Sequence, residues 1–151
     1  MNKIITIREA SKDDKEEIVR LTKDWEDEHI TYGFSGDDMS YFLNKKCYCA
    51  LIGNQVIGFI VGEVSVTYKD YEFVKKNTPY FEIDELYIIP DERKKGYGSK
   101  LYEFTEQKLK EEKIKYIMLS SATKDVESVL NFYVKKERMN VHYVRLYKEI
   151  N

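Results

Sequence analysis

The stretch Leu86–Leu101, LYIIPDERKKGYGSKL, combines residue types that could bind a phosphate group. An apolar run stops at Pro90, and the cations Arg93–Lys95 then precede two glycines, Gly96 and Gly98. The segment that follows has helical composition, and the first backbone N–H groups of a helix are unpaired and attract anions. Glycines allow close approach of the backbone to a ligand. The stretch therefore predicts a polyphosphate site at a strand–turn–helix junction.

The order of these residues excludes two common nucleotide motifs. A P-loop requires G-x-x-x-x-G-K-[ST], whereas Ser99 here precedes Lys100. A dinucleotide fingerprint requires three glycines as G-x-G-x-x-G, and only the first two are present. The alternative interpretation is a solvated basic turn before an ordinary helix. The succession of strand, proline, cations and paired glycines favours the phosphate site over that alternative.

Hydrophobic patterning predicts the elements that position this junction. Strands are expected at about 4–8, 46–52, 56–66, 81–89, 115–119 and 141–147. Helices are expected at about 11–29, 37–43, 98–112 and 126–134, the first opening with a capping box formed by Ser11 and Asp14. The resulting order is β-α-α-β-β-β-α-β-α-β, which predicts a mixed sheet with helices on both faces.

Composition narrows the class of protein. The 151 residues, 42% of them hydrophobic and 34% charged, predict one soluble domain over residues 1–151. The net charge of −2 argues against a nucleic-acid partner. No apolar run is long enough to cross a bilayer and no signal peptide begins the chain, so we expect no membrane partner and a cytoplasmic location. Cys47 and Cys49 are expected to be buried free thiols, and no metal site is expected.

At this point the sequence resembles the GNAT superfamily of acyl-CoA-dependent N-acyltransferases. The pyrophosphate motif of that family, Q/R-x-x-G-x-G/A, is matched by the run Arg93-Lys94-Lys95-Gly96-Tyr97-Gly98. The preceding Leu86–Pro90 strand end and a later Asn131-Phe132-Tyr133 segment are also similar to family patterns. The resemblance covers nearly the whole chain and implies a GNAT-like central mixed sheet of about six to seven strands.

The resemblance implies acetyl-CoA as the co-substrate and a primary amine, on a small molecule or a peptide, as the acceptor. The resemblance implies that these residues bind the co-substrate, through main-chain groups or, for Asn131, through the side-chain amide: Leu86, Tyr87, Ile88, Arg93, Lys94, Lys95, Gly96, Tyr97, Gly98, Ser99 and Asn131. In the family the central strand bends away from its parallel neighbour around a bulge, which lets the cofactor insert.

The chemistry requires a base, because an alkyl ammonium must lose a proton before it can attack a thioester. Glu82, Asp84 and Glu85 are the candidates, with Glu82 favoured over Glu85. Strict alternation would put Glu82 and Asp84 on one face of the strand and Glu85 on the other, but a bulge would change this parity. Glu63 on the neighbouring strand is a weaker candidate for binding the acceptor.

Tyr133 occupies the position of the family's general acid, where its hydroxyl could donate a proton to the departing thiolate. The same tyrosine also fits the apolar stripe of its helix, and the two roles are compatible.

The acceptor is expected between residues 25–43 and 66–80. The acidic side chains of the first segment would suit a cationic amine, although a solvated helix face explains them almost as well: Asp24, Glu26, Asp27, Glu28, Asp37 and Asp38.

The leading hypothesis is therefore an acetyl-CoA-dependent N-acetyltransferase that acts by direct attack. The alternative is a non-catalytic CoA-binding or regulatory module on the same fold. The identity of the amine and the oligomeric state, a homodimer included, are left open.

Overall fold

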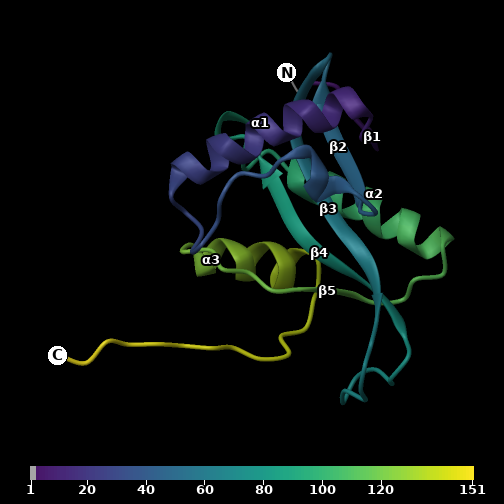
Figure 1. The fold of residues 1–151 in the computed structure, drawn as a ribbon, viewed down its shortest axis with the longest axis vertical. Helices are drawn as coiled ribbons and strands as arrows, with labels where there is room; N and C mark the ends of the chain where they lie inside the picture. Colours follow the sequence, from purple (N-terminus) through teal and green to yellow (C-terminus); the bar gives the residue numbers. More distant parts are fainter. Residues whose placement is uncertain (1–2) are drawn as a thin grey trace.

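The computed structural model describes residues 3–151 (Figure 1). Its strands are β1 (Ile5–Glu9), β2 (Lys46–Ile52), β3 (Gln55–Val66), β4 (Pro79–Ile88) and β5 (Ile117–Leu119). Its helices are α1 (Lys12–Glu28), α2 (Tyr97–Glu111) and α3 (Val126–Val129), with short 3-10 turns η1 (Met39–Phe42) and η2 (Pro90–Glu92). A π-helix, η3 (Leu130–Lys136), continues α3.

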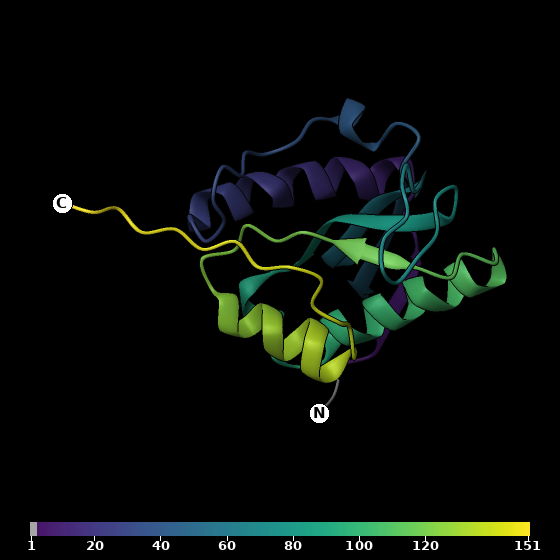
Figure 2. The ribbon, with the colours of Figure 1, turned by 90° about the horizontal axis from the view of Figure 1, so that it is seen from below.

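The strands form one mixed sheet in the order β1-β2-β3-β4-β5. The first four strands are antiparallel, and β5 is parallel to β4. Figure 2 shows α1 on one face of the sheet and α2 with α3 on the other. A separate hydrophobic core lies on each face: Ile18, Leu21 and Phe59 belong to the core under α1, and Phe81 and Leu101 to the core under α2. The predicted α/β architecture with helices on both faces is confirmed.

The start of α1 has the capping box that the sequence predicts. The Asp14 N–H donates to the Ser11 hydroxyl at 3.1 Å, and the Ser11 N–H donates to the Asp14 carboxylate at 2.9 Å. This capping box satisfies backbone donors that the first turn would otherwise leave unpaired. Cys47 and Cys49 on β2 are free and buried, also as predicted.

A β-bulge interrupts β4 at Asp84. Val61 on β3 lies opposite Glu85, whereas the next residue, Gly62, lies opposite Ile83, so Asp84 has no partner on β3. The extra residue shifts the alternation of side chains by one position. As a result Ile83 packs into the core under α2, while Tyr87 packs into the core under α1.

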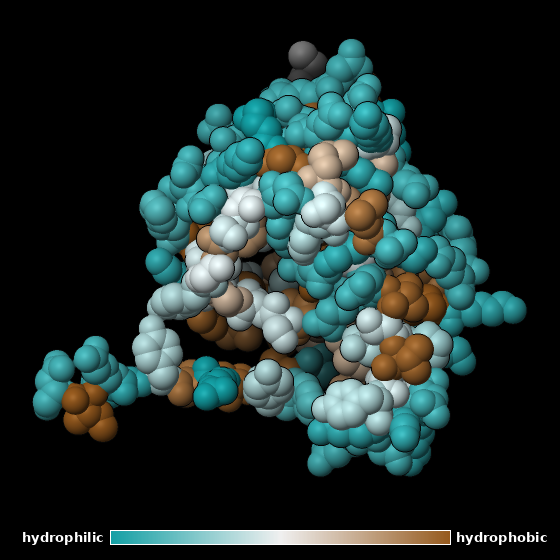
Figure 3. Space-filling model, viewed as in Figure 1, coloured by the Kyte–Doolittle hydropathy of each residue, from teal (hydrophilic) through white to brown (hydrophobic). Residues whose placement is uncertain are grey.

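The bulge marks the point where β4 leaves β5. Only residues 81–83 of β4 pair with β5, opposite residues 117–119. From Glu85 to Ile88 the strand remains paired with β3 but has no strand neighbour on its other edge within residues 3–151. Figure 3 shows a hollow on this face, bordered in part by hydrophobic residues, at the place where Figure 1 draws the diverging strands.

Three predicted features of the fold are wrong in detail. The sheet has five strands within residues 3–151, not six to seven, because the segment predicted as a strand at 141–147 pairs with no other strand there. A strand needs a neighbouring backbone to receive its hydrogen bonds, and a β-like residue pattern cannot supply one. The helix predicted at 37–43 is only the four-residue turn η1, and the helix predicted at 126–134 becomes a π-helix after its first turn.

No helix within the described part of the chain has the length and apolar character that a membrane crossing requires.

Candidate functional site

The predicted phosphate-binding motif forms the turn between η2 and α2. The backbone is left-handed at Lys94, with φ of 59°, and at Gly96, with φ of 83°. Within residues 3–151, none of the backbone N–H groups from residue 94 to residue 99 donates a hydrogen bond to a protein acceptor. A Cβ atom built at Gly96 would meet no atom within 4 Å, so this side of the turn is open. Consecutive free N–H groups at the N-terminus of a fifteen-residue helix are an arrangement that attracts anions.

Two of the three cations in the motif are bound by protein groups. The Arg93 guanidinium donates to both oxygens of Glu28, at 2.7 and 2.9 Å. Lys95 donates to the Glu92 carboxylate at 2.9 Å and to the Asp91 carbonyl at 2.8 Å. Lys94 is exposed and has no ion pair within residues 3–151. The charge of the motif that is available to a ligand is therefore smaller than its sequence suggests.

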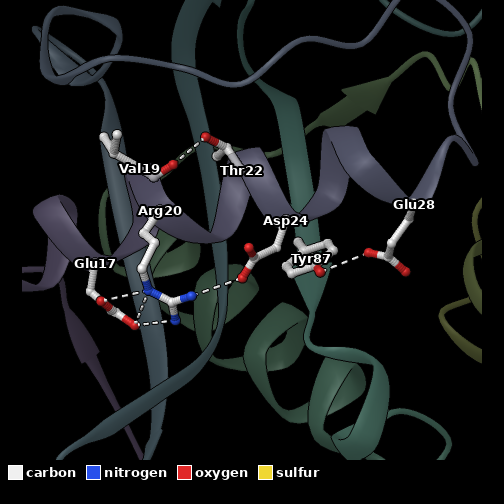
Figure 4. A network of polar contacts seen from close by, with 7 residues as sticks. All are labelled: Glu17, Val19, Arg20, Thr22, Asp24, Glu28 and Tyr87. Atoms are coloured by element: carbon white, nitrogen blue, oxygen red, sulfur yellow. Dashed lines mark hydrogen bonds and ion pairs between the residues drawn. The ribbon is translucent and has the colours of Figure 1, made fainter.

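Glu28 links the C-terminal end of α1 to β4 and to the motif (Figure 4). Its carboxylate accepts a hydrogen bond from the Tyr87 hydroxyl at 2.7 Å in addition to those from Arg93. The Tyr87 ring stacks on Trp25 of α1, with ring centroids 5.1 Å apart. Burial and the neighbouring Glu28 raise the pKa of the Tyr87 hydroxyl. The Tyr87 side chain is thus packed in the core under α1.

Backbone groups of β4 line the open edge beyond the bulge. The Ile89 N–H donates to the Ile57 carbonyl on β3 at 2.9 Å. Because successive residues of a strand point their N–H and C=O groups to opposite edges, those of Leu86 and Ile88 point away from β3. The Ile88 carbonyl accepts the Arg93 Nε–H at 2.8 Å. The backbone groups of Leu86 and the Ile88 N–H are left facing the open edge.

The bulge also brings the carboxylates of β4 to one face. Glu85 is opposite Val61, a residue of the core under α1, and Glu82 is opposite Glu63, two residues further along the same face of β3. Glu82 and Glu85 therefore lie on the α1 face together, against the parity that strict alternation would give. Asp84 forms an ion pair with Lys45 at 2.7 Å.

Glu85 lies beside Asp37, which belongs to the segment between α1 and η1. The Asp37 N–H donates to the Thr22 hydroxyl at 2.9 Å, and Thr22 in turn donates to the Val19 carbonyl of α1 at 2.7 Å (Figure 4). Only 8% of Glu85 is exposed. Burial, followed by the repulsion of Asp37, raises the pKa of Glu85 to about 9. Glu85 is therefore protonated at neutral pH.

Glu82 lies in a wetter environment than Glu85. Its side chain is half-buried, and burial, followed by repulsion from Asp84 and Glu63, raises its pKa. The pKa of Asp37 is also raised by burial. Both glutamates of β4 therefore have raised pKa values, and Glu85, with a pKa of about 9, is the less suited of the two to accept a proton at neutral pH.

Tyr133 and Asn131 lie on the π-helix η3, which packs against α2. The ring of Tyr133 contacts Tyr102 edge-to-face at 6.3 Å, and burial raises the pKa of its hydroxyl. Asn131 is exposed. Phe132, between them, packs close to Gly98, where a Cβ would lie 3.4 Å from its ring. The predicted motif and the predicted Asn-x-Tyr segment are thus neighbours in the fold.

Sequence reasoning missed the internal role of several acids. Glu28 was expected to face a cationic acceptor, but it binds Arg93 and Tyr87, and Asp24 pairs with Arg20 (Figure 4). The Glu28 contacts join residues 59 and 65 positions apart, so no local spacing could have indicated them. Arg20 and Asp24 are four positions apart on a helix, a spacing that could have indicated their pair.

Replacing Glu85 with glutamine should change how stability depends on pH. The pKa of Glu85 is about 9 in the folded chain against an ordinary value of 4.5, so between these values the folded state holds a proton that the unfolded state has lost. Stability should therefore fall as pH rises through this window. Glu85→Gln, which cannot titrate, should flatten this fall and be more stable than the original chain at neutral pH. Urea unfolding at a series of pH values measures both effects.

The matched control is Glu103→Gln, a change at an exposed position of α2. It should leave the pH dependence of stability as it is in the original chain. Equal slopes for all three proteins would show that Glu85 ionises normally.

The sequence matches the model of the acetyltransferase (GNAT) family over residues 6–137. A comparison with curated proteins gave no match. Among solved structures, the fold is similar to an aminoglycoside acetyltransferase from an uncultured soil metagenomic sample, with 20% identity, 97% of each chain covered and a TM-score of 0.68.

Two further structures have a similar fold. A predicted acetyltransferase from Clostridium acetobutylicum, solved with acetyl-CoA, is 19% identical over 95% of this chain and 96% of its own, with a TM-score of 0.69. A transcriptional regulator from Bacillus halodurans C-125 is 19% identical over 97% of this chain and 100% of its own, with a TM-score of 0.72. At these identities the neighbours support the fold, while the family model spans most of the sequence. The chain belongs to the GNAT family of acetyltransferases.

Proposed function

We propose that this protein transfers an acetyl group from acetyl-CoA to a primary amine. The observation that carries the proposal is the juxtaposition of an anion-binding helix N-terminus, an open edge of β4 and a group of carboxylates beside the bulge. The family match and the neighbour solved with acetyl-CoA support the same donor.

The residues of the motif fit a diphosphate group. The free N–H groups of residues 94–99 would hold its oxygens, with Lys94 and Lys100 adding exposed positive charge. Tyr97 and Ser99 are buried side chains that would contribute only through the backbone. Arg93 would act indirectly, because its guanidinium is committed to Glu28 and to the Ile88 carbonyl.

The rest of the donor would follow the open edge of β4. The backbone groups of Leu86 and the Ile88 N–H face this edge, whereas those of Tyr87 between them point toward β3. The exposed amide of Asn131 is available on η3. Bound acetyl-CoA would supply an electrophilic thioester carbon and a thiolate leaving group. Its thioester would then lie close to the bulge, where the carboxylates of the α1 face begin.

Glu82 is the residue that we assign as the general base. It would take a proton from the ammonium group of the acceptor, directly or through water, and its raised pKa favours this near neutral pH. The amine nitrogen then bonds to the carbonyl carbon as the carbon–sulfur bond breaks. The sulfur leaves as a thiolate, and the nitrogen gives its second proton to water to form the amide. Glu85 holds its own proton at neutral pH, so it would not serve as the base in the free enzyme.

We assign Tyr133 the role of interacting with the departing thiolate through its hydroxyl group. Because burial raises the pKa of its hydroxyl above the ordinary value, full proton transfer to a thiolate of pKa ~8.5 would be uphill. Donation of a hydrogen bond to the sulfur is therefore the role that its environment favours over complete proton transfer.

The alternative function is a CoA-binding or regulatory module without turnover, and one similar structure is described as a transcriptional regulator. The deciding experiment incubates the protein with acetyl-CoA and a panel of amines, and measures thiol release and product mass. Acetylation of any amine above the uncatalysed rate supports the enzyme. Tight CoA binding with no product from any amine would instead support the CoA-binding or regulatory module. The cytoplasmic location remains a prediction from sequence.

Replacing Glu82 with glutamine should lower kcat/KM most strongly near neutral pH, by roughly 10²–10⁴-fold, the usual contribution of a general base. At high pH the free amine becomes abundant, so part of the activity should return. Steady-state rates measured from neutral to alkaline pH test this. Glu103→Gln, on an exposed turn of α2, is the control. A pH–rate profile that Glu82→Gln leaves unchanged would assign the base elsewhere.

A further inference from the structure

Glu28 is the last residue of α1, a position that is unfavourable for an acid. The C-terminal end of a helix carries a partial negative charge, which favours cations in the last turn and disfavours carboxylates. The last turn of α1 contains Glu26, Asp27 and Glu28 and no basic residue. The side chain of Glu28 is nevertheless only 20% exposed. The stability of the helix does not account for this carboxylate, so its reason lies in its contacts outside α1.

The Glu28 carboxylate binds one residue of β4 and one residue of the phosphate-binding motif. Both of its oxygens accept hydrogen bonds from the Arg93 guanidinium, at 2.7 and 2.9 Å. The oxygen Oε2 also accepts a hydrogen bond from the Tyr87 hydroxyl at 2.7 Å (Figure 4). The guanidinium carbon of Arg93 lies 5.2 Å from the centroid of the Tyr87 ring, which is a cation–π distance. The three side chains therefore form one charge-balanced cluster.

Arg93 connects this cluster to the open edge of β4. Its Nε–H donates to the Ile88 carbonyl at 2.8 Å, while its two terminal nitrogens bind Glu28. A guanidinium is planar and its N–H groups have fixed directions, so an arginine that uses all three nitrogens is held in one orientation. The Arg93 side chain thus ties the first residue of the motif to the last residue of β4.

The other hydrogen bonds of this corner are local. The Glu92 N–H donates to the Ile89 carbonyl at 3.0 Å, and the Arg93 N–H donates to the Pro90 carbonyl at 3.2 Å, which closes the turn η2 upon itself. Among the hydrogen bonds of residues 3–151, only those of the Arg93 side chain join residues 90–96 to β4 and to α1. The direction in which the motif leaves β4 therefore depends on Arg93, and the orientation of Arg93 depends on Glu28.

This direction matters for a ligand that binds both parts of the site. In the proposed function, the N–H groups of residues 94–99 hold the diphosphate, and the free backbone groups of Leu86 and Ile88 hold the arm that leads to the thioester. Two binding surfaces reinforce each other only when the distance between them matches the ligand. A misplacement of the reacting atoms by about 1 Å can lower a rate by about 10²-fold.

We propose that Glu28 is a positioning residue for acetyl-CoA. Acting through Arg93 and supported by Tyr87, it fixes the diphosphate-binding turn relative to the open edge of β4. The inference rests on the proposed acetyl transfer and gives Glu28 a role on the donor side of the site, although its place in a run of acids suggests the acceptor side. In this role Glu28 contacts Arg93 and Tyr87 rather than the donor, so it is not a catalytic residue.

The first test compares the affinities of two ligands and does not depend on turnover. CoA carries a diphosphate and a pantetheine arm, whereas adenosine 5′-diphosphate carries a diphosphate without the arm. Glu28→Gln removes the charge that holds Arg93 and so loosens the turn from the strand. The dissociation constant of CoA should rise about tenfold, because hydrogen bonds to the arm are lost, and that of adenosine 5′-diphosphate should stay within about twofold. Titration calorimetry measures both constants.

The matched control is Glu112→Gln, which breaks the ion pair of 2.8 Å between Glu112, the C-cap of α2, and Lys46 on β2. This pair joins residues 66 positions apart, and the Glu28–Arg93 pair joins residues 65 positions apart. The control should leave both affinities unchanged. If Glu28 only neutralised the charge of Arg93, Glu28→Gln would strengthen the binding of both ligands alike. That result, an equal weakening of both ligands, or an unchanged affinity for CoA would overturn the inference.

The second test measures turnover at saturating acetyl-CoA with an amine that the original chain acetylates. Because the thioester would be misplaced, Glu28→Gln should lower kcat by about 10- to 100-fold, with little change in KM for the amine. Arg93→Lys keeps the positive charge but cannot span Glu28 and the Ile88 carbonyl, so it should lower kcat similarly. The double variant should be no slower than the slower single variant, because both substitutions remove the same contact.

Thermal unfolding of each variant separates positioning from stability. A lower Tm with an unchanged kcat would show that the Glu28–Arg93 pair only stabilises the fold, and it would overturn the inference, as would losses of kcat that multiply in the double variant. An original chain that binds CoA but acetylates no amine would overturn the proposed function, while the affinity comparison would still decide the role of Glu28. An original chain that binds no CoA would overturn both.

Discussion

The separation of β4 from β5 after Ile83 is the constraint on which the rest of the site depends. Apart from the bulge at Asp84, β4 stays paired with β3 as far as Ile88 while losing its neighbour on the other side. A strand in the middle of a sheet would normally have both edges satisfied, so this separation leaves backbone groups that need partners. Arg93 supplies one partner by bonding the Ile88 carbonyl. The remaining groups form the edge along which a polyamide chain such as that of CoA could bond.

The same bulge determines which side chains of β4 lie on each face of the sheet. Before Asp84 the odd-numbered residues Phe81 and Ile83 enter the core under α2, and after it Tyr87 enters the core under α1. Without the extra residue Glu85 would point toward α2, away from Glu82. The bulge therefore places Glu82 and Glu85 on the α1 face of the sheet, while the turn proposed to bind the diphosphate begins on the other face, at α2.

Features that depend on neighbours in sequence could be predicted, and features that depend on distant partners could not. The Ser11 capping box, the turn at Gly96 and the helical stripe of α1 each follow from residues within a few positions of one another. The parity of Glu85 depends on how β3 and β4 are registered, and alternation along one strand contains no information about register. The segment 141–147 has the composition of a strand, but a strand also requires a partner, which the sequence does not specify.

Charge illustrates the same limit. Three adjacent cations in the motif indicate an anion site, yet Arg93 and Lys95 are held by Glu28 and Glu92. The side chains of Glu28 and Arg93 are only 20% and 33% exposed, respectively, so loss of either partner would leave the other as a half-buried unpaired charge. This pair joins the last turn of α1, which borders the acidic face, to the first residue of the Arg93–Gly98 motif. The two halves of the proposed site, one for the donor and one for the acceptor, are thus positioned by a single bidentate contact.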